Sequence, residues 1–261
     1  RLVLNKLELE PGVVPGEISS AQVGVPAYRG APPQDCEYLL HRLCDWLNSD
    51  SFRPPDVPPV VAGLIRAIMA HLYLAWIHPF GNGNGRTARL VEFQILVSAG
   101  TPKPAAHLLS NHYNLTRDEY YRQLSYASKS GGNILPFIEY AVQGLIDGLK
   151  QQLDVIRGQQ WSVAWTDYVH GLLGGEAIPA VRRRHLILDL SEKSDRVSLQ
   201  QVTHVSPRTA EAYAKKKRVT LMRDLRILES MGLLEIDDTG VRARRESILA
   251  FLPARKLSTS T

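Results

Sequence analysis

The sequence has little of what builds a disulfide framework or a membrane span. It contains only two cysteines, Cys36 and Cys44, at a spacing that suits neighbouring turns of one helix. Two thiols without nearby metal ligands indicate reduced core cysteines in a cytoplasmic protein. The longest uncharged apolar stretch, residues 67–80, is too short for a span and includes two histidines. The basic, polar first residues do not resemble a signal peptide, so we expect a cytoplasmic protein without membrane association.

Net positive charge is missing from the first two thirds of the chain. Residues 1–175 carry 14 Lys and Arg against 15 Asp and Glu, a net charge of −1. Residues 176–261 carry 17 against 11, a net charge of +6, so the last third holds all of the positive excess. This asymmetry indicates two modules with different partners. The length also allows more than one domain, and we find no internal repeat.

Glycine and asparagine are concentrated in one stretch, residues 78–86, which reads HPFGNGNGR. Glycines let the backbone adopt positive φ and let its N–H groups converge on an anion. Apolar helical patterns over residues 59–77 and 87–99 frame the stretch. The loop therefore leads into the N-terminus of a helix, where unpaired amides and the helix dipole favour a phosphate. The sequence predicts a phosphate-binding loop.

This loop resembles the signature of the Fic family, usually written HPFx(D/E)GNGRxxR. The matching positions are His78, Pro79, Phe80, Gly83, Asn84, Gly85, Arg86 and Arg89. The resemblance covers roughly residues 10–160 and implies a mainly α fold, a Fic-type helical bundle with a small β-hairpin flap. It also implies a cytoplasmic, bacterial protein adenylyltransferase, which transfers AMP from ATP to a Ser, Thr or Tyr hydroxyl of a target protein.

The resemblance implies a role for each residue of the loop. His78 would be the base that deprotonates the target hydroxyl, a task that suits a histidine pKa near neutral pH. Arg86 would hold phosphate and Arg89 would reach the γ-phosphate, because guanidinium groups donate hydrogen bonds in pairs. A surface ion pair between Arg89 and Glu92 is the competing interpretation. The other nucleotide-binding residues would be three of the loop and two of the adenine pocket: Gly83, Asn84, Gly85, Tyr120 and Tyr121.

The chain departs from the family pattern at Asn82, where the signature has a carboxylate that binds Mg²⁺. An amide oxygen can coordinate Mg²⁺ but brings no charge, and Mg²⁺ prefers anionic oxygens. Three outcomes stay open: a weakened metal site with slower transfer, a phosphate-containing donor other than ATP, or nucleotide binding without turnover. A fourth hypothesis is deamidation of Asn82, which would create the missing carboxylate and which intact-mass measurement would detect.

A flap and a set of helices are expected around the loop. Residues 16–26 read as a short β-hairpin. In Fic proteins a hairpin at this place docks the target by strand addition, so the resemblance implies docking at Gln22, Val23 and Gly24. Apolar periodicity predicts helices over residues 35–48, 60–77, 87–99, 115–127 and 134–160. The second of these is apolar on nearly all faces, which makes it a central helix with His71 as a buried structural residue.

The sequence contains no hexapeptide of the pattern (S/T)xxxE(G/N). In many Fic proteins this pattern belongs to an inhibitory helix whose glutamate pairs with the second arginine. Three alternatives stay open: an inhibitory helix upstream in cis, one supplied in trans by another protein, or none. A homodimer is a further open alternative.

The character of the chain changes between Trp161 and Pro179, and we place a domain boundary near residue 175. We expect an N-terminal segment with the flap over residues 1–33, a Fic helical domain over 34–175 and a basic domain over 176–261. In the basic domain we expect helices over residues 180–190, from 198 and over 220–231. The last of these, a glycine and a strand–turn–strand pattern over 233–243 are similar to a winged helix-turn-helix module, an α+β domain.

Basic residues precede and line the proposed recognition helix: Lys215, Lys216, Lys217, Arg218, Arg223 and Arg226. Phosphate contacts from these side chains, and from arginines at 242, 244 and 245, would give salt-dependent DNA affinity. Asp224 and Glu229 lie among them and weaken the DNA interpretation, as do acids at 237 and 238. The alternative is a solvated face for dimerisation or target binding.

Two functions compete with the adenylyltransferase. One is a catalytically weak nucleotide-binding transcriptional regulator that binds DNA through its C-terminal domain. The other is a Fic-type transferase that uses another phosphate-containing donor.

Overall fold

The computed structural model describes residues 2–4, 8–9, 13–25 and 28–251. The described chain is mainly helical and forms two compact units, Arg1–Leu153 and Asp154–Thr261. The boundary that we placed near residue 175 lies inside the second unit, and the three-part domain assignment stays a prediction.

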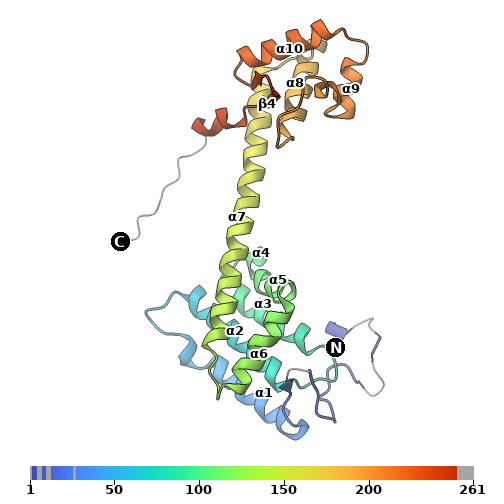
Figure 1. Cartoon of the computed structure of the whole chain (residues 1–261). Helices are drawn as coiled ribbons and strands as arrows, with labels where there is room; N and C mark the ends of the chain where they lie inside the picture. The colour runs from blue at the N-terminus through green and yellow to red at the C-terminus, as the bar shows by residue number, and fades with distance from the viewer. Residues whose placement is uncertain (1, 5–7, 10–12, 26–27, 252–261) are drawn as a thin grey trace. The chain divides into compact units, whose positions relative to one another are not determined.

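Two antiparallel helices form the centre of the first unit. They are α2 (Pro59–Ile77) and α3 (Asn84–Ser98), which pack against each other (Figure 1). Buried side chains of α2 such as Ile68 and Leu72 contribute to a core with Leu96 of α3. The expected central helix is therefore confirmed, and α3 begins three residues earlier than its apolar period indicated. Asn84, Gly85 and Arg86 thus form its first turn.

By length and composition, α2 is the one helix among the described residues that could cross a membrane. It has 19 residues, a mean hydropathy of 1.8 and half of its apolar window buried inside the protein. Our expectation that no apolar run reaches the length of a span was therefore wrong, because a single charge, Arg66, does not interrupt the helix. Within the unit α2 packs against α1 and α3, as a core helix does.

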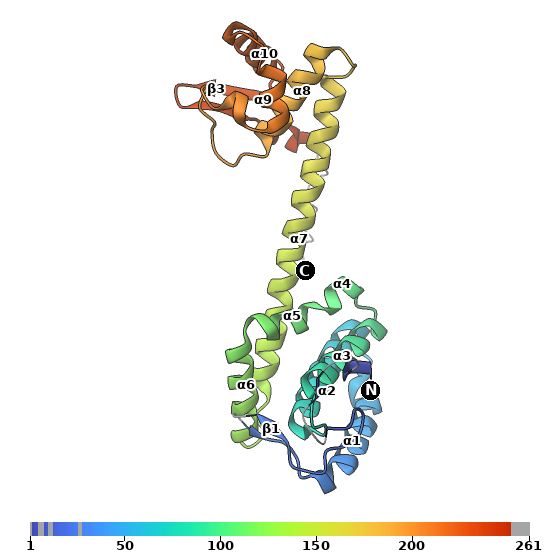
Figure 2. The same ribbon diagram turned by 90° about the vertical axis from the view of Figure 1, so that its right-hand side faces the viewer.

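Further helices surround this pair (Figure 2). α1 (Pro33–Asn48) packs against α2 through Leu43 and Leu47. The remaining helical elements of the unit are η1 (Leu2–Leu4), η2 (Asp50–Phe52), α4 (Lys103–Ala106), α5 (Leu108–Leu115), α6 (Arg117–Lys129) and the start of α7. The expected helix over 115–127 corresponds to α6, and a break at Thr116 separates it from α5. The Thr116 hydroxyl donates to the His112 carbonyl oxygen at 2.8 Å.

The flap hairpin lies later in the chain than we expected. β1 (Gly24–Val25) pairs antiparallel with β2 (Tyr28–Arg29), in the register Gly24 to Arg29 and Val25 to Tyr28. The expected hairpin over 16–26 is therefore wrong in position, because the paired strands are Gly24–Val25 and Tyr28–Arg29. The earlier residue Ile18 instead forms an isolated bridge with Phe80 of the glycine-rich loop.

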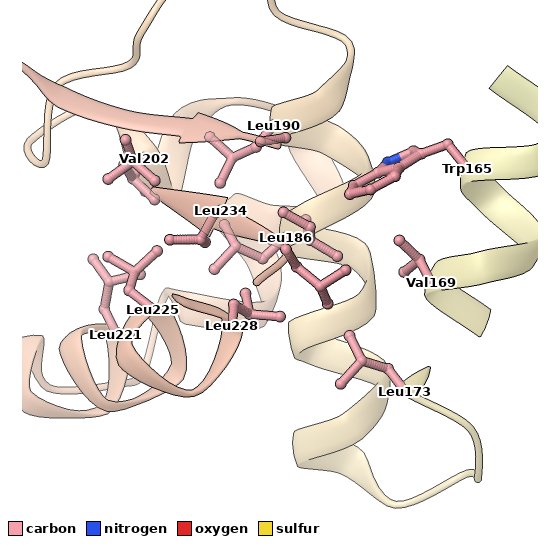
Figure 3. Close-up of a cluster of buried hydrophobic side chains, with 14 of the residues drawn as sticks. Trp165, Val169, Leu173, Leu186, Leu190, Val202, Leu221, Leu225, Leu228 and Leu234 are labelled. Carbon is pink, nitrogen blue, oxygen red and sulfur yellow. The ribbon is translucent and has the colours of Figure 1, made fainter. Parts of the chain in front are cut away.

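The helix that we expected to end at residue 160 is longer. α7 runs over Leu135–Leu172, and the boundary between the two units falls inside it. Trp165 and Val169, in the C-terminal part of this helix, lie in the core of the second unit (Figure 3). These two apolar residues are four apart, so burial of one helix face explains why the helix continues.

The second unit consists of short helices and one two-stranded sheet. Its elements are α8 (Ile178–Ser191), η3 (Val202–His204), α9 (Pro207–Tyr213), α10 (Arg218–Ser230), β3 (Leu234–Asp237), β4 (Gly240–Ala243) and η4 (Arg245–Phe251). β3 and β4 are antiparallel, and Leu234 pairs with Ala243. The expected helices over 180–190 and 220–231 and the strand–turn–strand are confirmed. The helix expected from 198 is wrong, because Ser206 caps α9 by accepting from the Thr209 N–H.

Leucines of α8, α10 and β3 fill the core of this unit. Figure 3 shows Leu186 and Leu190 of α8 facing Leu225 and Leu228 of α10, with Leu234 between them. All five are buried. Burial of a leucine side chain contributes roughly 1.5–3 kcal/mol, so this cluster accounts for the packing of α8, α10 and the sheet.

Candidate functional site

A cavity of about 400 Å³ opens where α2 ends and α3 begins. It brings together the predicted residues of the first unit with a single exception: Val23, Gly24, His78, Asn82, Gly83, Asn84, Gly85, Arg86, Arg89, Tyr120 and Tyr121. The exception is Gln22, whose amide Nε2 donates to the Gly30 carbonyl oxygen at 2.7 Å. Gln22 thus stabilises the hairpin, and its predicted docking role stays a prediction.

Sequence reasoning did not assign three polar side chains of the cavity wall to the site. Tyr113, Asn114 and Arg117 also line the cavity. Tyr113, Arg117 and Tyr120 follow a spacing of four and three residues, which could have indicated a shared helical face. The break at Thr116 hides this signal, because it splits the stretch between two helices.

His78 stands at the C-terminal end of α2 in a left-handed conformation, with φ 50° and ψ 51°. Its backbone N–H donates to the Leu74 carbonyl oxygen at 3.1 Å and ends the helix. Its Nδ1 lies 3.1 Å from the carbonyl oxygen of Ala75. A carbonyl oxygen only accepts, so Nδ1 carries the proton and Nε2 is the unprotonated nitrogen of the neutral ring.

The environment of His78 favours the neutral ring. Burial lowers the pKa of His78, and the hydrogen bond to the Ala75 carbonyl oxygen opposes this in part. Burial acts in this direction because removing water penalises the charged imidazolium. At neutral pH the Nε2 atom can therefore accept a proton.

The base of the hairpin packs directly against His78. The Gly30 N–H donates to the Val23 carbonyl oxygen at 2.9 Å, and the Ala31 N–H donates to the Ile77 carbonyl oxygen at 3.0 Å. A Cβ atom at Gly30 would lie 2.6 Å from the Val23 oxygen and 2.7 Å from the His78 Cβ atom. Glycine at this position thus allows the hairpin and the histidine to approach each other.

Asn84 closes the glycine-rich loop. Its side chain is buried, accepts from the Phe80 N–H at 2.9 Å and donates to the Phe80 carbonyl oxygen at 2.6 Å. The amide group that we expected to face phosphate therefore bonds to the loop backbone. Gly83 precedes it with φ +87°, which starts α3 without a side-chain cap. The first-turn amides of α3 lie at the cavity, where they suit an anion.

Asn82, the predicted metal position, contacts an arginine. The Arg86 Nη2 atom donates to the Asn82 Oδ1 atom at 3.0 Å, and the Arg86 Nη1 atom donates to the Val3 carbonyl oxygen at 3.3 Å. The oxygen that would bind Mg²⁺ therefore already accepts from a cation.

The donor set of the cavity does not fit Mg²⁺. Among the described residues that line it there is no Asp or Glu, and no group of three His, Cys, Asp or Glu occurs elsewhere in the described chain. Three arginines, Arg86, Arg89 and Arg117, line the same cavity. Because Mg²⁺ prefers anionic oxygens, these residues suit an anion rather than this metal.

Arg89 lies over the first turn of α3. Its Nη1 atom is 3.3 Å from the position that a Cβ atom at Gly85 would occupy. The competing ion pair with Glu92 is not formed between these two described residues. Glu92 is buried, accepts from the Tyr113 hydroxyl at 3.0 Å and lies 3.4 Å from Nδ1 of His71.

A buried polar network supports the tyrosines of the cavity. The His71 Nε2 atom lies 2.9 Å from the Tyr120 hydroxyl oxygen, and both side chains are buried. The expectation that His71 is a buried structural residue is consistent with these contacts. Tyr121 is half-buried, and the Arg117 guanidinium lies 5.7 Å from its ring centroid. The roles of both tyrosines toward a nucleobase stay predictions.

In the second unit, the basic residues that we singled out are all exposed: Lys215, Lys216, Lys217, Arg218, Arg223 and Arg226. Asp224, by contrast, does not lie on the surface with these cations. Its side chain is buried, and its Oδ2 atom lies 2.7 Å from the Arg182 Nη2 atom. In the sheet, Arg242 pairs with Glu235 at 3.3 Å and Glu246 at 2.8 Å.

Part of the first unit matches a known family model. Residues 4–96 match the family model described as Fic/DOC family, so the chain contains a Fic/DOC family domain. The domain covers the hairpin, α1, α2, the glycine-rich loop and most of α3.

Two curated relatives are also similar to part of this chain. The chain is 34% identical over 128 residues to the protein adenylyltransferase Fic of Nematostella vectensis, covering 49% of this chain and 27% of that protein. It is 33% identical over 148 residues to the protein adenylyltransferase fic-1 of Caenorhabditis elegans, covering 54% of this chain and 26% of that protein. The chain thus spans about a quarter of the length of these relatives. A crystal structure of a Fic family protein from Desulfovibrio desulfuricans G20 aligns with a TM-score of 0.46 and 22% identity, over 90% of this chain and 60% of that one.

Proposed function

We propose that this protein is an adenylyltransferase that moves AMP from ATP to a Ser, Thr or Tyr hydroxyl of a target protein. One observation carries the proposal: His78, with Nδ1 on the Ala75 carbonyl oxygen, shares a cavity with the first turn of α3 and its arginines. A general base beside a phosphate site is what transfer of a nucleotide to a hydroxyl requires. The similar proteins of Nematostella and Caenorhabditis, named protein adenylyltransferases, support the same activity.

The cavity supplies a base and an anion site. Nε2 of His78 takes the proton of the target hydroxyl while its oxygen attacks the α-phosphorus of ATP. The bond from the α-phosphorus to the bridging oxygen of the β-phosphate breaks, and pyrophosphate leaves. Amides of the first turn of α3 and the Arg86 and Arg89 guanidinium groups stabilise the negative charge on the phosphate oxygens.

The hairpin at the cavity supports target docking by strand addition. Val23 and Gly24 line the cavity, and Gly24 begins the two-residue strand β1. A target segment that pairs with main-chain groups there would bring its hydroxyl toward His78. The target is therefore an extended segment that carries Ser, Thr or Tyr.

Position-specific labelling distinguishes the donor. Cell lysate is incubated with the protein and ATP labelled at the α-phosphate, and in parallel with ATP labelled at the γ-phosphate. AMP transfer labels target proteins from the α-phosphate alone. Label from the γ-phosphate alone would indicate phosphotransfer, and label from neither, despite nucleotide binding, would favour the alternative of another phosphate-containing donor.

A second candidate function follows from the exposed basic residues of α10. We suggest a winged-helix-like module in the second unit that binds nucleic acid through Arg223 and Arg226 and the Lys215–Arg218 run, as in the alternative of a weakly catalytic transcriptional regulator. The observation that favours it is that Asp224 points into the core rather than among these cations. Fluorescence anisotropy with duplex DNA tests it: affinity should fall steeply between about 50 and 200 mM salt. Unchanged affinity in the double variant Arg223→Gln/Arg226→Gln would count against it.

Location and regulation remain proposals. We suggest a reducing compartment such as the cytoplasm, because Cys36 and Cys44 are free thiols, and cell fractionation tests this. An inhibitory helix in cis or in trans and a homodimer stay open. Activity measured with and without added lysate fractions, and the mass of the protein in solution, would detect them.

A further inference from the structure

The cavity contains positive charge and, among its described lining residues, no carboxylate to offset it. Arg86, Arg89 and Arg117 line it together with neutral amides, and the described lining includes no carboxylate. The first turn of α3 likewise has no acidic residue. The helix dipole adds partial positive charge at the same place. The protein itself therefore supplies positive charge to an anion that enters.

Asn82 stands where the Fic signature has a carboxylate, and its side-chain oxygen is already engaged. Its Oδ1 atom accepts from the Arg86 Nη2 atom at 3.0 Å, and the Val3 carbonyl oxygen holds the other end of the guanidinium at 3.3 Å. A cation on Asn82 Oδ1 would lie next to this fixed positive charge, and the described lining of the cavity offers no anionic ligand to offset it. A carboxylate at the same position would both neutralise Arg86 and offer a second oxygen to a metal.

We propose that this cavity binds the polyphosphate of its donor without a divalent cation, and that the three arginines supply the charge that a metal provides elsewhere. The inference rests on the proposed nucleotide site and names the ionic form of its ligand. Metal-free ATP carries more negative charge than its magnesium complex. A site built from cations and neutral donors favours the metal-free form.

Isothermal titration calorimetry of the full chain with ATP, once in EDTA and once in excess MgCl₂, tests the proposal. We expect the wild-type dissociation constant in EDTA to be equal to or lower than that in MgCl₂. The variant Asn82→Asp should reverse this order, with binding at least about tenfold tighter in MgCl₂, because it adds an anionic oxygen. Wild-type binding that is tenfold or more tighter in MgCl₂ overturns the proposal.

Two arginines of α6 provide a matched comparison for the role of charge. Arg117→Gln removes one cation of the cavity and should weaken metal-free ATP binding about tenfold. Arg122→Gln removes an exposed arginine that pairs with Glu119 outside the cavity and should leave binding unchanged. Equal affinities of wild type and Arg117→Gln would contradict the assigned role of Arg117.

Separate measurements of ATP binding and of AMP transfer distinguish failure of this proposal from failure of the proposed function. Metal-independent ATP binding supports the inference whatever the transfer assay gives, and failure to transfer AMP then counts against the adenylyltransferase alone. Absence of ATP binding in both EDTA and MgCl₂ overturns both.

Discussion

The side-chain oxygen of Asn82 accepts a hydrogen bond from Nη2 of Arg86 at 3.0 Å. This contact joins the position at which the Fic signature has a carboxylate to the first arginine of that signature. A neutral amide leaves the guanidinium charge uncompensated, whereas a carboxylate would form a charge-assisted pair with it. One substitution in the loop therefore changes the net charge of the whole anion site.

The rate of AMP transfer should rise with pH and then level off. Burial lowers the pKa of His78 below its ordinary value of about 6.5, and the Ala75 carbonyl oxygen opposes this in part. The base acts only when neutral, so kcat/KM falls as pH drops through this lowered pKa and is constant above it. Single-turnover rates from about pH 5 to about pH 8 measure the profile. A rate that still climbs steeply between pH 7 and pH 8 would contradict this role for His78.

The variant Gly30→Ala should impair transfer. Its Cβ atom would lie 2.7 Å from the His78 Cβ atom and 2.6 Å from the Val23 carbonyl oxygen, so the hairpin and the histidine must move apart. We expect a loss of tenfold or more in kcat/KM and about 1–3 kcal/mol in the free energy of unfolding. Denaturant unfolding and the labelling assay measure the two effects.

Gly158→Ala is the control for this variant. Gly158 lies in α7, and no atom is within 4 Å of the added Cβ. The change should stabilise the helix by up to about 1 kcal/mol and leave transfer unchanged. Wild-type activity in Gly30→Ala would show that the close approach of hairpin and histidine is not needed.

Asn84→Ala should destabilise the loop and weaken ATP binding together. It removes both hydrogen bonds to the backbone of Phe80 and leaves that N–H and carbonyl oxygen without their partner. Such a loss costs roughly 1–3 kcal/mol for each buried group. Unfolding and calorimetry measure the two losses. The exposed residue Asn111 gives a control, since Asn111→Ala should change stability by less than about 0.5 kcal/mol. Unaltered ATP affinity in Asn84→Ala would contradict the role of the loop.

Asp224→Ala should strongly destabilise the second unit. The Asp224 carboxylate is buried and accepts from Arg182 at 2.7 Å and from the Tyr213 hydroxyl at 3.0 Å. Its removal leaves the buried Arg182 guanidinium without an anion, which costs about 3–5 kcal/mol. Asp154→Ala, which removes an exposed partner of Arg157, should cost less than about 1 kcal/mol. Equal unfolding midpoints of the two variants would contradict this assignment.

Local pattern was sufficient to predict several elements of the fold. The apolar residues of α2 and α10 recur at helical spacing, and the strand–turn–strand after Gly232 alternates with clear turn residues. The length of α7 was not predictable in this way, because it depends on Trp165 and Val169 packing into a core that forms elsewhere in the chain. The hairpin was misplaced because each of its strands has only two residues, too few for an alternating pattern to locate them.

The candidate site was predictable where residues are close in sequence. The loop from His78 to Arg89 could be identified from its glycines and arginines. Arg117 was not assigned to the site, because its approach to the cavity depends on how α6 packs. The Asn84 contacts with Phe80 and the Arg86 contact with Asn82 involve side-chain directions that spacing does not determine.

Intact-mass spectrometry of target proteins tests the central claim most directly. Lysate proteins are incubated with ATP and either wild type, His78→Ala or the control His41→Ala, which removes an exposed histidine of α1. We predict an AMP adduct with wild type and His41→Ala, and none with His78→Ala, whose ATP affinity by calorimetry stays within about twofold of wild type. An adduct of equal yield with His78→Ala, or no adduct with wild type in either EDTA or MgCl₂, would contradict the account.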